Sequence, residues 1–307
     1  MSPYSSITVG TDFSACSAVA VAQAVRLAGL SGTRPRVVHV LDTLVVTDLE
    51  RKLSPLQVSI QESLVRDARL AWKEFASTIP DTPDAAGLEL DIRINNRVVG
   101  LIDHARSTNA DLLVVGALGD QAPDVGAGTV ATGCVRKAPC DVLLVRDTHR
   151  GPYRTILACV DFSDSALRAL GAAARFARRE GAALHIINVY EGTANPFPFS
   201  TSLQRAIDDS NAQTAALVRE RLDRFIARAG PDFPGTTPTL HTVDAASCGR
   251  GIVQCAKALG SDLIVLGTRG RSNLRDTLLG STAERVLRDS RSSILAVRPA
   301  EFARAES

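Results

Sequence analysis

Short apolar and β-branched runs alternate along the chain with longer segments in which apolar residues recur every three or four positions. This alternation is typical of a parallel sheet whose strands are joined by crossover helices. Residues at helical spacing follow the first two strand-like runs of the second half, and further helices are expected over residues 251–258 and 282–287. The runs that predict strands in that half cover residues 155–160, 184–189, 239–243, 262–266 and 293–297.

The same succession of elements occurs twice, because the two halves of the chain repeat each other. Residues 11–14 (TDFS) return 149 positions later as residues 160–163 (VDFS), and residues 142–146 (VLLVR) return 152 positions later as residues 294–298 (ILAVR). A period this long indicates a duplicated domain and not a solenoid of short repeats. The length of 307 residues also favours two domains.

The repeat predicts two tandem α/β domains, residues 1–148 and 152–300, each built on a doubly wound parallel sheet of five strands. In the first half, apolar residues at positions 88, 90, 92 and 94 alternate with polar ones, so the third strand is expected at an edge with one wet face. Doubly wound folds bind ligands at the carboxyl ends of their strands. The functional residues are therefore expected in the loops that follow the strands.

A glycine-marked loop follows the fourth expected strand of the second half. It consists of residues 267–270 (GTRG), nine further residues, and residues 280–282 (GST). Glycines allow sharp turns with unhindered amides, and a helix that starts at Gly280 presents free amides and the positive end of its dipole to a phosphate. The plainer alternative is a capping box, in which Ser281 and Glu284 only cap that helix.

An aspartate follows the first expected strand of each half. Asp161 and Asp12 would lie at the carboxyl end of the sheet, where they could contact a ligand. The alternative is that each aspartate only caps the next helix, which begins near Ser163 in the second half. No second carboxylate or base adjoins either aspartate in sequence, so no catalytic residue is predicted.

The Asp-Phe-Ser segments, the glycine loop and the last strand together resemble the universal stress protein family. The resemblance occurs twice and covers nearly the entire chain. The resemblance implies a Rossmann-like fold of the adenine nucleotide alpha hydrolase type, with strand order 3-2-1-4-5 and the two fifth strands paired as an internal pseudo-dimer. It also implies adenosine near Asp161 and Val189, ATP phosphates on the glycine loop, and Mg²⁺ as the accompanying ion. The residues expected to bind ATP are Cys159, Asp161, Val189, Leu266, Gly267, Gly270, Gly280, Ser281 and Thr282.

The first half departs from this family pattern. Its loop has eight residues between Gly119 and Gly128, one fewer than in the second half, and its charge from Gly116 to Gly128 is −2, against +2 from Gly267 to Gly280. At about 0.5 kcal/mol per charge near a phosphate chain, this difference amounts to roughly 2 kcal/mol, or about thirtyfold in affinity. We therefore expect weaker or altered binding in the first half, through Asp12, Val40, Gly116, Gly119, Gly128 and Thr129.

Composition argues against several other functions. A net charge of +2 and an aromatic content of 4% do not favour a nucleic-acid binder. No apolar run is long enough to cross a membrane and no secretory leader is apparent, so a soluble cytoplasmic protein is expected. The six cysteines and five histidines lack metal-binding spacing, although Cys16 is expected at a helix start that would stabilise a thiolate.

These observations favour an ATP-binding regulatory protein of the stress response, whose nucleotide occupancy alters conformation or partner binding. At most slow hydrolysis is expected, because the chain lacks a Gly-x-x-x-x-Gly-Lys-Ser/Thr loop. The alternatives are an ATP-hydrolysing or nucleotidyl-transferring enzyme and a nucleotide-free interaction platform. The sequence identifies no protein partner and leaves homodimerisation open. Residues 191–202, rich in Pro, Phe and Ser, are expected to form a lid, a partner site or a local plug made by Phe197 and Phe199.

Overall fold

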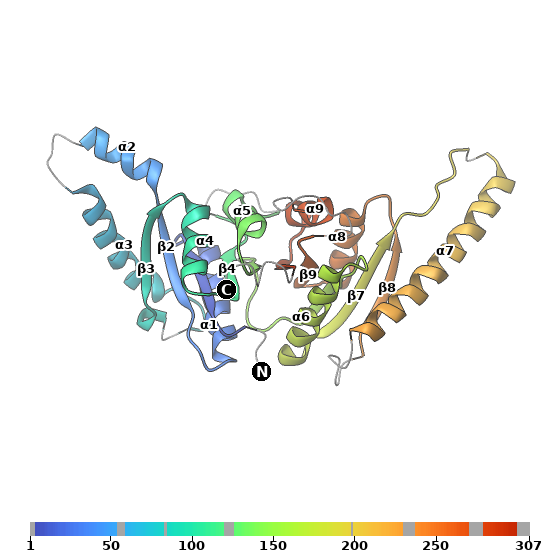
Figure 1. Cartoon of the computed structure of the whole chain (residues 1–307), viewed down its shortest axis with the longest axis horizontal. Helices are drawn as coiled ribbons and strands as arrows, with labels where there is room; N and C mark the ends of the chain where they lie inside the picture. The colour runs from blue at the N-terminus through green and yellow to red at the C-terminus, as the bar shows by residue number, and fades with distance from the viewer. Residues whose placement is uncertain are drawn as a thin grey trace. The chain divides into compact units, whose positions relative to one another are not determined.

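The computed structural model describes residues 4–53, 59–82, 85–119, 126–197, 199–229, 237–269 and 279–299. The chain divides into two compact units (Figure 1). Unit 1 comprises Met1–Gly151 together with Ser293–Ser307, and unit 2 comprises Pro152–Ser292.

Unit 1 is an α/β domain in which helices pack on a mostly parallel sheet. Its strands are β1 (Ile7–Thr11), β2 (Arg36–Asp42), β3 (Leu90–Asn95), β4 (Leu112–Gly116), β5 (Asp141–Val145) and β10 (Ser293–Val297). Its helices are α1 (Ala15–Gly29), α2 (Thr43–Leu53), α3 (Ile60–Ala76), the 3₁₀ turn η2 (Ala85–Gly87), α4 (Arg97–Ser107) and α5 (Thr129–Lys137).

The first five strands of unit 1 are parallel and lie in the order β3-β2-β1-β4-β5, as expected from the sequence. Strand β3 is at the edge, which confirms the reading of its alternating pattern. Strand β10, from the end of the chain, adds to β5 in antiparallel orientation, with Leu295 opposite Leu143. The expected pairing between the fifth strands of the two repeats is thereby confirmed.

Unit 2 repeats the plan with the order β9-β6-β7-β8, all parallel. Its strands are β6 (Thr155–Cys159), β7 (Ala183–Tyr190), β8 (Thr239–Asp244) and β9 (Leu263–Gly267), and its helices are α6 (Asp164–Glu180), α7 (Thr201–Arg228), α8 (Cys248–Leu259) and α9 (Ser281–Asp289). Gly181 follows α6 and Gly260 follows α8 as C-cap residues, both in the left-handed conformation, which glycine adopts without strain.

Helix α2 has no counterpart among the elements expected from the sequence. It buries one side chain, that of Val46, while Leu44 and Val45 are exposed. Val46, Leu49 and Leu53 recur in it at helical spacing, so the apolar pattern was present and the sequence analysis missed it. Within the described ranges, no helix is both long and apolar enough to cross a bilayer. The cytoplasmic location stays a prediction.

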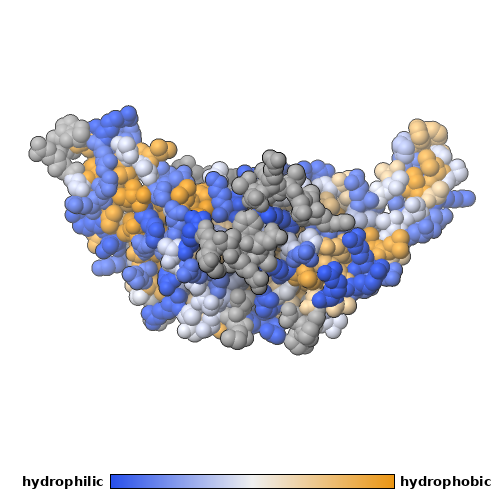
Figure 2. All heavy atoms as spheres, viewed as in Figure 1, coloured by the Kyte–Doolittle hydropathy of each residue, from blue (hydrophilic) through white to orange (hydrophobic). Residues whose placement is uncertain are grey.

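Apolar side chains also reach the surface of both units (Figure 2). In unit 1 they include Leu44, Val45 and Leu70 of α2 and α3, and in unit 2 they include Phe197 and Phe199, just before α7. Phe197 is 53% and Phe199 84% exposed, and their rings lie 5.9 Å apart. The plug alternative is therefore wrong, because these two rings pack on each other and not into the core of their unit.

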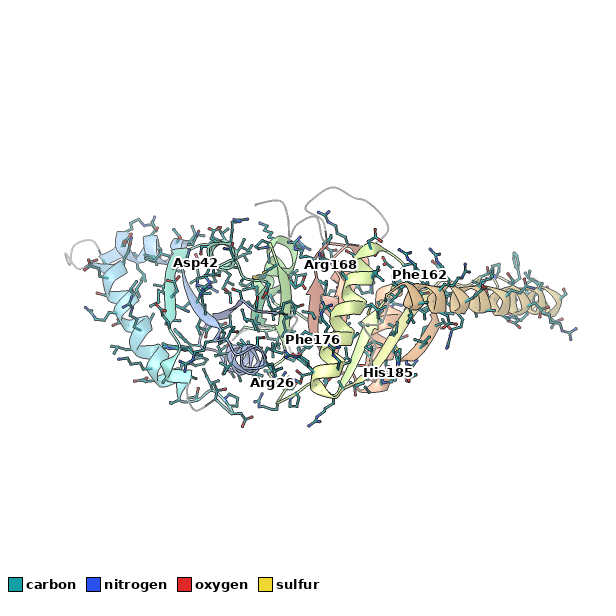
Figure 3. The ribbon with its side chains drawn as sticks, turned by 60° about the horizontal axis from the view of Figure 1, so that its bottom comes forward. Arg26, Asp42, Phe162, Arg168, Phe176 and His185 are labelled. Carbon is teal, nitrogen blue, oxygen red and sulfur yellow. The ribbon has the colours of Figure 1, made fainter. Side chains whose placement is uncertain are left out.

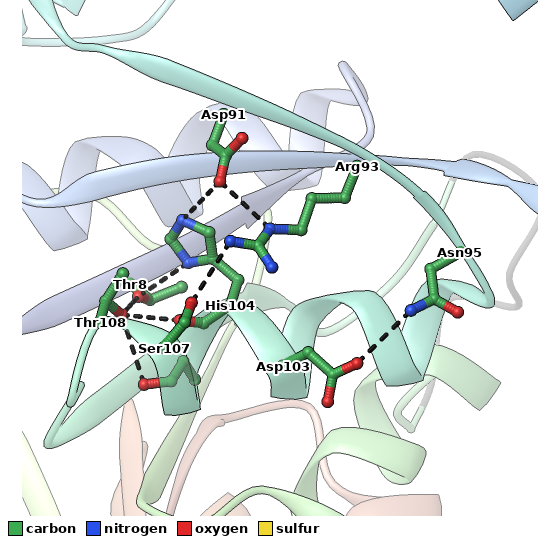
Figure 4. A network of polar contacts seen from close by, with 9 residues as sticks. Thr8, Asp91, Arg93, Asn95, Asp103, His104, Ser107 and Thr108 are labelled. Carbon is green, nitrogen blue, oxygen red and sulfur yellow. Dashed lines mark hydrogen bonds and ion pairs between the residues drawn. The ribbon is translucent and has the colours of Figure 1, made fainter.

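A buried histidine ties strands β1 and β3 of unit 1 to helix α4 (Figure 4). His104, 2% exposed, contacts the Thr8 hydroxyl through Nδ1 at 3.2 Å and a carboxylate oxygen of Asp91 through Nε2 at 3.4 Å. Arg93 donates from Nε to the same Asp91 oxygen at 3.1 Å. Burial lowers the pKa of His104, and Asp91 only partly offsets this effect.

We expect the chain to lose stability as the pH falls below 6.5, the ordinary pKa of histidine. The folded state holds the His104 proton less tightly than the unfolded state, so this contribution is complete above pH 6.5 and is lost as pH falls through the lowered pKa. Burial also lowers the pKa of His39 and of His241, in the same direction. Urea unfolding across this range should show a slope of up to about 1.4 kcal/mol per pH unit for each histidine. His104→Gln should reduce the slope, and an unchanged slope would contradict the assignment.

Candidate functional site

The expected site residues of the second half meet at one edge of the sheet of unit 2. Strands β6 and β9 are parallel neighbours, with Ala158 opposite Val265, so Asp161 and Gly267 follow adjacent carboxyl ends. The start of α9 joins them, because the Gly280 amide donates to the Thr268 carbonyl at 3.2 Å. Topology thus brings Asp161 together with Gly267 and Gly280, which lie more than 100 residues later in the sequence. Gly270 lies outside the described residues.

Asp161 forms a tight turn and does not cap the helix. Its Oδ1 accepts hydrogen bonds from the amide of Ser163 at 3.0 Å and from its hydroxyl at 2.5 Å. Ser163 is itself the N-cap of α6, accepting from the Ala166 amide at 3.1 Å. The alternative in which Asp161 is the cap is therefore wrong, and the same holds for Asp12 and Ser14 in unit 1.

A strained residue follows the aspartate in both units. Phe162 and Phe13 both have φ of 65°, a left-handed conformation that is uncommon for aromatic residues. The Phe162 ring (labelled in Figure 3) packs edge-on against Phe225 of α7 at 5.6 Å, and the Arg221 guanidinium lies 4.2 Å above it. Such strain persists only where the surrounding structure enforces it, and it is frequent at functional sites.

Gly267 is needed for packing, in addition to any contact with a ligand. A Cβ at this position would lie 2.9 Å from Cβ of Ser165 and 3.2 Å from its backbone carbonyl carbon. Gly116 has the corresponding place in unit 1, where a Cβ would lie 3.1 Å from Sγ of Cys16. In both units the glycine lets the end of the fourth strand approach the first turn of the helix after the first strand.

We expect Gly267→Ala to lower the free energy of unfolding by about 1 to 3 kcal/mol, because the added methyl overpacks against backbone atoms that cannot swing away. Urea unfolding without nucleotide measures this loss. Gly128→Ala is the matched control, since its Cβ would approach nothing closer than 3.7 Å, and it should change stability by less than about 0.5 kcal/mol. Equal effects of the two substitutions would contradict the packing role.

The N-terminus of α9 carries no side-chain cap. Gly280 is the N-cap residue, with φ of −64° and ψ of 144°, and Ser281 is the first helical residue. The capping-box alternative is wrong, since it requires Ser281 at the N-cap, and that position belongs to Gly280. Ser281 is exposed and Thr282 half-buried, so the helix end with its amides faces outward at the edge of the sheet.

The remaining expected residues lie at different depths. Cys159 and Leu266 are buried, at 9% and 4% exposure, and burial raises the pKa of the Cys159 thiol. Val189 is half-buried and packs against α8, where a Cβ on Gly251 would come within 2.8 Å of it. At the same place, the thiol of Cys248 donates to the Val189 carbonyl at 3.6 Å. The sequence analysis missed Cys248 and Gly251, which are adjacent to the site only through the fold.

Two buried polar atoms beneath this edge have no hydrogen-bond partner. Asn188, 5% exposed, donates from Nδ2 to the carbonyl of Val160 at 2.7 Å, and its Oδ1 is unpaired. The hydroxyl of Ser165, 7% exposed and adjacent to Gly267, is unpaired as well. A buried polar atom without a partner costs about 1 to 3 kcal/mol, so a ligand or water that pairs with it is stabilised. Both residues escaped the sequence analysis, because neither lies in a recognisable motif.

In unit 1, the side chain that corresponds to Ser165 forms hydrogen bonds within the unit. Cys16 takes the place of Ser165; its thiol donates to the Val145 carbonyl at 3.3 Å and its sulfur accepts from the Leu118 amide at 3.5 Å. Cys16 lies at the start of α1 as expected, but the expected stabilisation of its thiolate is wrong, because Cys16 is 5% exposed and burial raises its pKa. The Leu118 amide, part of the first glycine loop, is thereby occupied by a sulfur atom.

His39 replaces Asn188 in unit 1. Its Nδ1 bonds to the Thr11 carbonyl at 2.8 Å, as Asn188 does to Val160, and its ring stacks on Phe13 at 4.5 Å. Phe75 packs edge-on against the same Phe13 ring at 5.4 Å.

The expected loop residues of unit 1 also converge at its own sheet edge. Gly119 lies near Asp12, because a Cβ on this glycine would be 3.5 Å from Asp12 Oδ2, and the Gly128 amide donates to the Ala117 carbonyl at 2.8 Å. Thr129 begins α5, which has no side-chain cap, and Val40 lies under Gly100 as Val189 lies under Gly251. Unit 1 therefore retains the backbone arrangement of the site, but Cys16 and His39 replace Ser165 and Asn188.

Comparison with known proteins gives a consistent family assignment. The family model described as "Universal stress protein family" matches residues 3–146 and again residues 152–298. A universal stress protein of Mycolicibacterium smegmatis is 27% identical over 300 residues, covering 95% of this chain and 97% of that protein. A solved universal stress protein of Archaeoglobus fulgidus covers 96% of this chain and 98% of its own, with a TM-score of 0.62 at 18% identity. A universal stress protein solved in complex with cAMP is 30% identical over 48% of this chain, with a TM-score of 0.34.

Proposed function

Because the chain belongs to the universal stress protein family, we propose that unit 2 binds ATP at the edge formed by Asp161, Gly267 and the start of α9, and that the occupied state regulates the protein in the stress response. Nucleotide binding, and not rapid chemistry, is the proposed activity. Bound ATP would act by shifting the population of conformations that differ in their affinity for it.

The observation that carries the proposal is the pair of unpartnered buried atoms, Asn188 Oδ1 and Ser165 Oγ, beneath the site edge of unit 2. One is an acceptor and the other is both donor and acceptor, which suits a ligand rich in N–H groups and oxygens. Unit 1 places a histidine and an internally bonded cysteine at the same positions. The two units thus differ where a ligand or its bound water would be recognised.

The helix end supports the phosphate part of the proposal. The first amides of an α-helix lack internal partners, and its dipole favours an anion. Helix α9 begins beside Thr268 with a glycine as its N-cap residue, which has no side chain to compete for those amides. Residues 280–282 would hold phosphate, and Mg²⁺ would reduce the charge of the bound triphosphate.

Within the described part of the chain, no cluster of three or more His, Cys, Asp or Glu side chains is suited to hold a metal ion. Mg²⁺ is commonly held by phosphates and waters, so a bound triphosphate would carry it with few protein ligands. Asp161 Oδ1 is engaged by Ser163, which fixes the carboxylate in place. We assign Asp161 to the adenosine end of the nucleotide.

Calorimetric titration of nucleotide-stripped full-length protein with ATP and Mg²⁺ tests the proposal. One site per chain, lost on Asn188→Leu and retained on His39→Leu, is the expected result. Two equal sites would contradict the difference between the units, and no binding by calorimetry and equilibrium dialysis would overturn the proposal in favour of an interaction platform. A turnover number of about 1 s⁻¹ or more for ATP would instead indicate an enzyme.

A further inference from the structure

Arg221 of α7 lies over an aromatic ring at the edge that forms the proposed nucleotide site. Its guanidinium carbon is 4.2 Å from the centroid of the Phe162 ring, which Figure 3 labels. Arg221 is exposed, and within the described ranges no ion pair joins it to a carboxylate, whereas Arg219 and Arg224 on the same helix each pair with one at 3.5 Å. The ring of Phe162 is therefore the partner that the fold gives to this charge.

Phe162 stands at the centre of the turn that orients Asp161. The amide of Ser163 donates to Asp161 Oδ1 at 3.0 Å, so the bond spans Phe162, which has φ of 65°. A side chain that bonds the backbone two residues on forms an Asx turn, in which the carboxylate and the middle residue depend on each other. A non-glycine residue with positive φ persists only where its surroundings hold it. Groups that hold the Phe162 ring therefore also hold the carboxylate of Asp161.

The corresponding ring of unit 1 is also stacked on one face, by a residue from another element. Phe13 has the same φ of 65°, and the imidazole of His39 lies 4.5 Å from its centroid with 20° between the planes. His39 belongs to β2, while Arg221 belongs to α7. Each unit thus places a flat, nitrogen-containing group on its strained phenylalanine, and the two groups are not related by the repeat.

The repeat itself shows that the stacking residue differs between the units. Phe225 contacts the strained ring of unit 2 edge-on at 5.6 Å, and Phe75 contacts that of unit 1 in the same way at 5.4 Å. These two phenylalanines therefore correspond. Arg221 lies four residues before the first of them, and Ala71 lies four residues before the second. Alanine has no planar group to stack, so unit 1 depends on His39 instead.

The exchange frees a position in unit 2. His39 occupies in unit 1 the place that Asn188 has in unit 2, where the amide oxygen is buried without a partner. Because Arg221 stacks from α7, this place need not supply the stacking group. On the basis of the nucleotide site proposed above, we infer that Arg221 is a positioning residue, which holds Phe162 and, through it, the Asp161 carboxylate toward adenosine.

Adenosine separates this role from simple attraction between charges. A guanidinium near the site attracts the phosphates of ATP, and salt screens such an attraction. Adenosine carries no phosphate, so a residue that acts through Asp161 affects adenosine and ATP by the same factor. A cation–π contact at an exposed site predicts an effect of roughly two- to fivefold.

Calorimetric titration of nucleotide-stripped full-length protein with adenosine, and with ATP and Mg²⁺, tests the inference. Arg221→Met should weaken the binding of both ligands roughly two- to fivefold. In a Phe162→Leu background the same substitution should have no further effect, because the ring is gone. Arg224→Met is the matched control: Arg224 lies exposed on the same helix and pairs with Glu220 at 3.5 Å, so its loss should leave both affinities unchanged.

Unchanged affinity for both ligands in Arg221→Met would overturn the inference even if its urea midpoint falls, because a residue that only stabilises the fold does not change the affinity of the folded protein. A loss that is confined to ATP and abolished by about 0.5 M salt would overturn it as well, since Arg221 would then act by attracting phosphate. A parent protein that binds neither adenosine nor ATP would instead overturn the proposed function itself, and the inference with it.

Discussion

Replacing Gly280 with valine is expected to weaken ATP binding to unit 2 at least about a hundredfold, which corresponds to about 2.7 kcal/mol. Gly280 is the N-cap of α9, and a branched side chain there would stand in front of the helix amides that are proposed to hold phosphate. Its φ of −64° and ψ of 144° are allowed for valine, so the backbone need not move. Calorimetric titration with ATP and Mg²⁺ measures the loss.

The matched control is Gly128→Val, the same change at the start of α5 in unit 1. Gly128 is also an uncapped helix start with extended backbone angles, and a Cβ there meets nothing within 3.4 Å. This variant should bind ATP as the parent protein does, because unit 1 is expected to bind nucleotide weakly. Full binding by Gly280→Val, or an equal loss in both variants, would show that the start of α9 is not the phosphate site.

The main features of the fold could be predicted because they depend on short-range patterns. The β-branched runs that become β1, β4, β6 and β9 are buried along nearly their whole length, so their apolar character is continuous. The strand order and the pairing of the last strands came from the family resemblance, which the repeat shows twice. Helix α2 was not among the expected elements, although Val46, Leu49 and Leu53 recur in it at helical spacing.

The site was predictable only in part, for a physical reason. Asp161 and the glycines are local signals, since a turn or a close approach requires those residue types at those positions. Asn188 and Ser165 contribute through burial and the lack of a partner, which are properties of the folded chain alone. Gly267 shows a further limit: it fits the phosphate-loop motif, yet Ser165 already requires a glycine there for packing. The motif thus identified Gly267 correctly, but it did not reveal that packing is a second reason for the glycine.

Leu295→Ala in β10 is expected to lower the free energy of unfolding of unit 1 by about 3 to 5 kcal/mol, as for other leucines fully buried in a core. Leu295 is 0% exposed and lies opposite Leu143 of β5, which is also 0% exposed. Although Leu295 belongs to the second half of the sequence, its strand is part of unit 1. The loss should therefore appear in strands of the first half.

Hydrogen exchange followed strand by strand separates this expectation from general destabilisation. The amides of β5 should lose protection in Leu295→Ala, because they bond to a strand that the cavity loosens. Leu240→Ala is the control: it removes a leucine that is half-buried on β8, the last strand of unit 2, and should cost about 1 kcal/mol without changing exchange in β5. Unchanged protection of β5 in Leu295→Ala would mean that β10 does not stabilise unit 1. Loss of protection there would show that the end of the chain holds the first repeat together, so truncation before residue 293 should destabilise unit 1 as well.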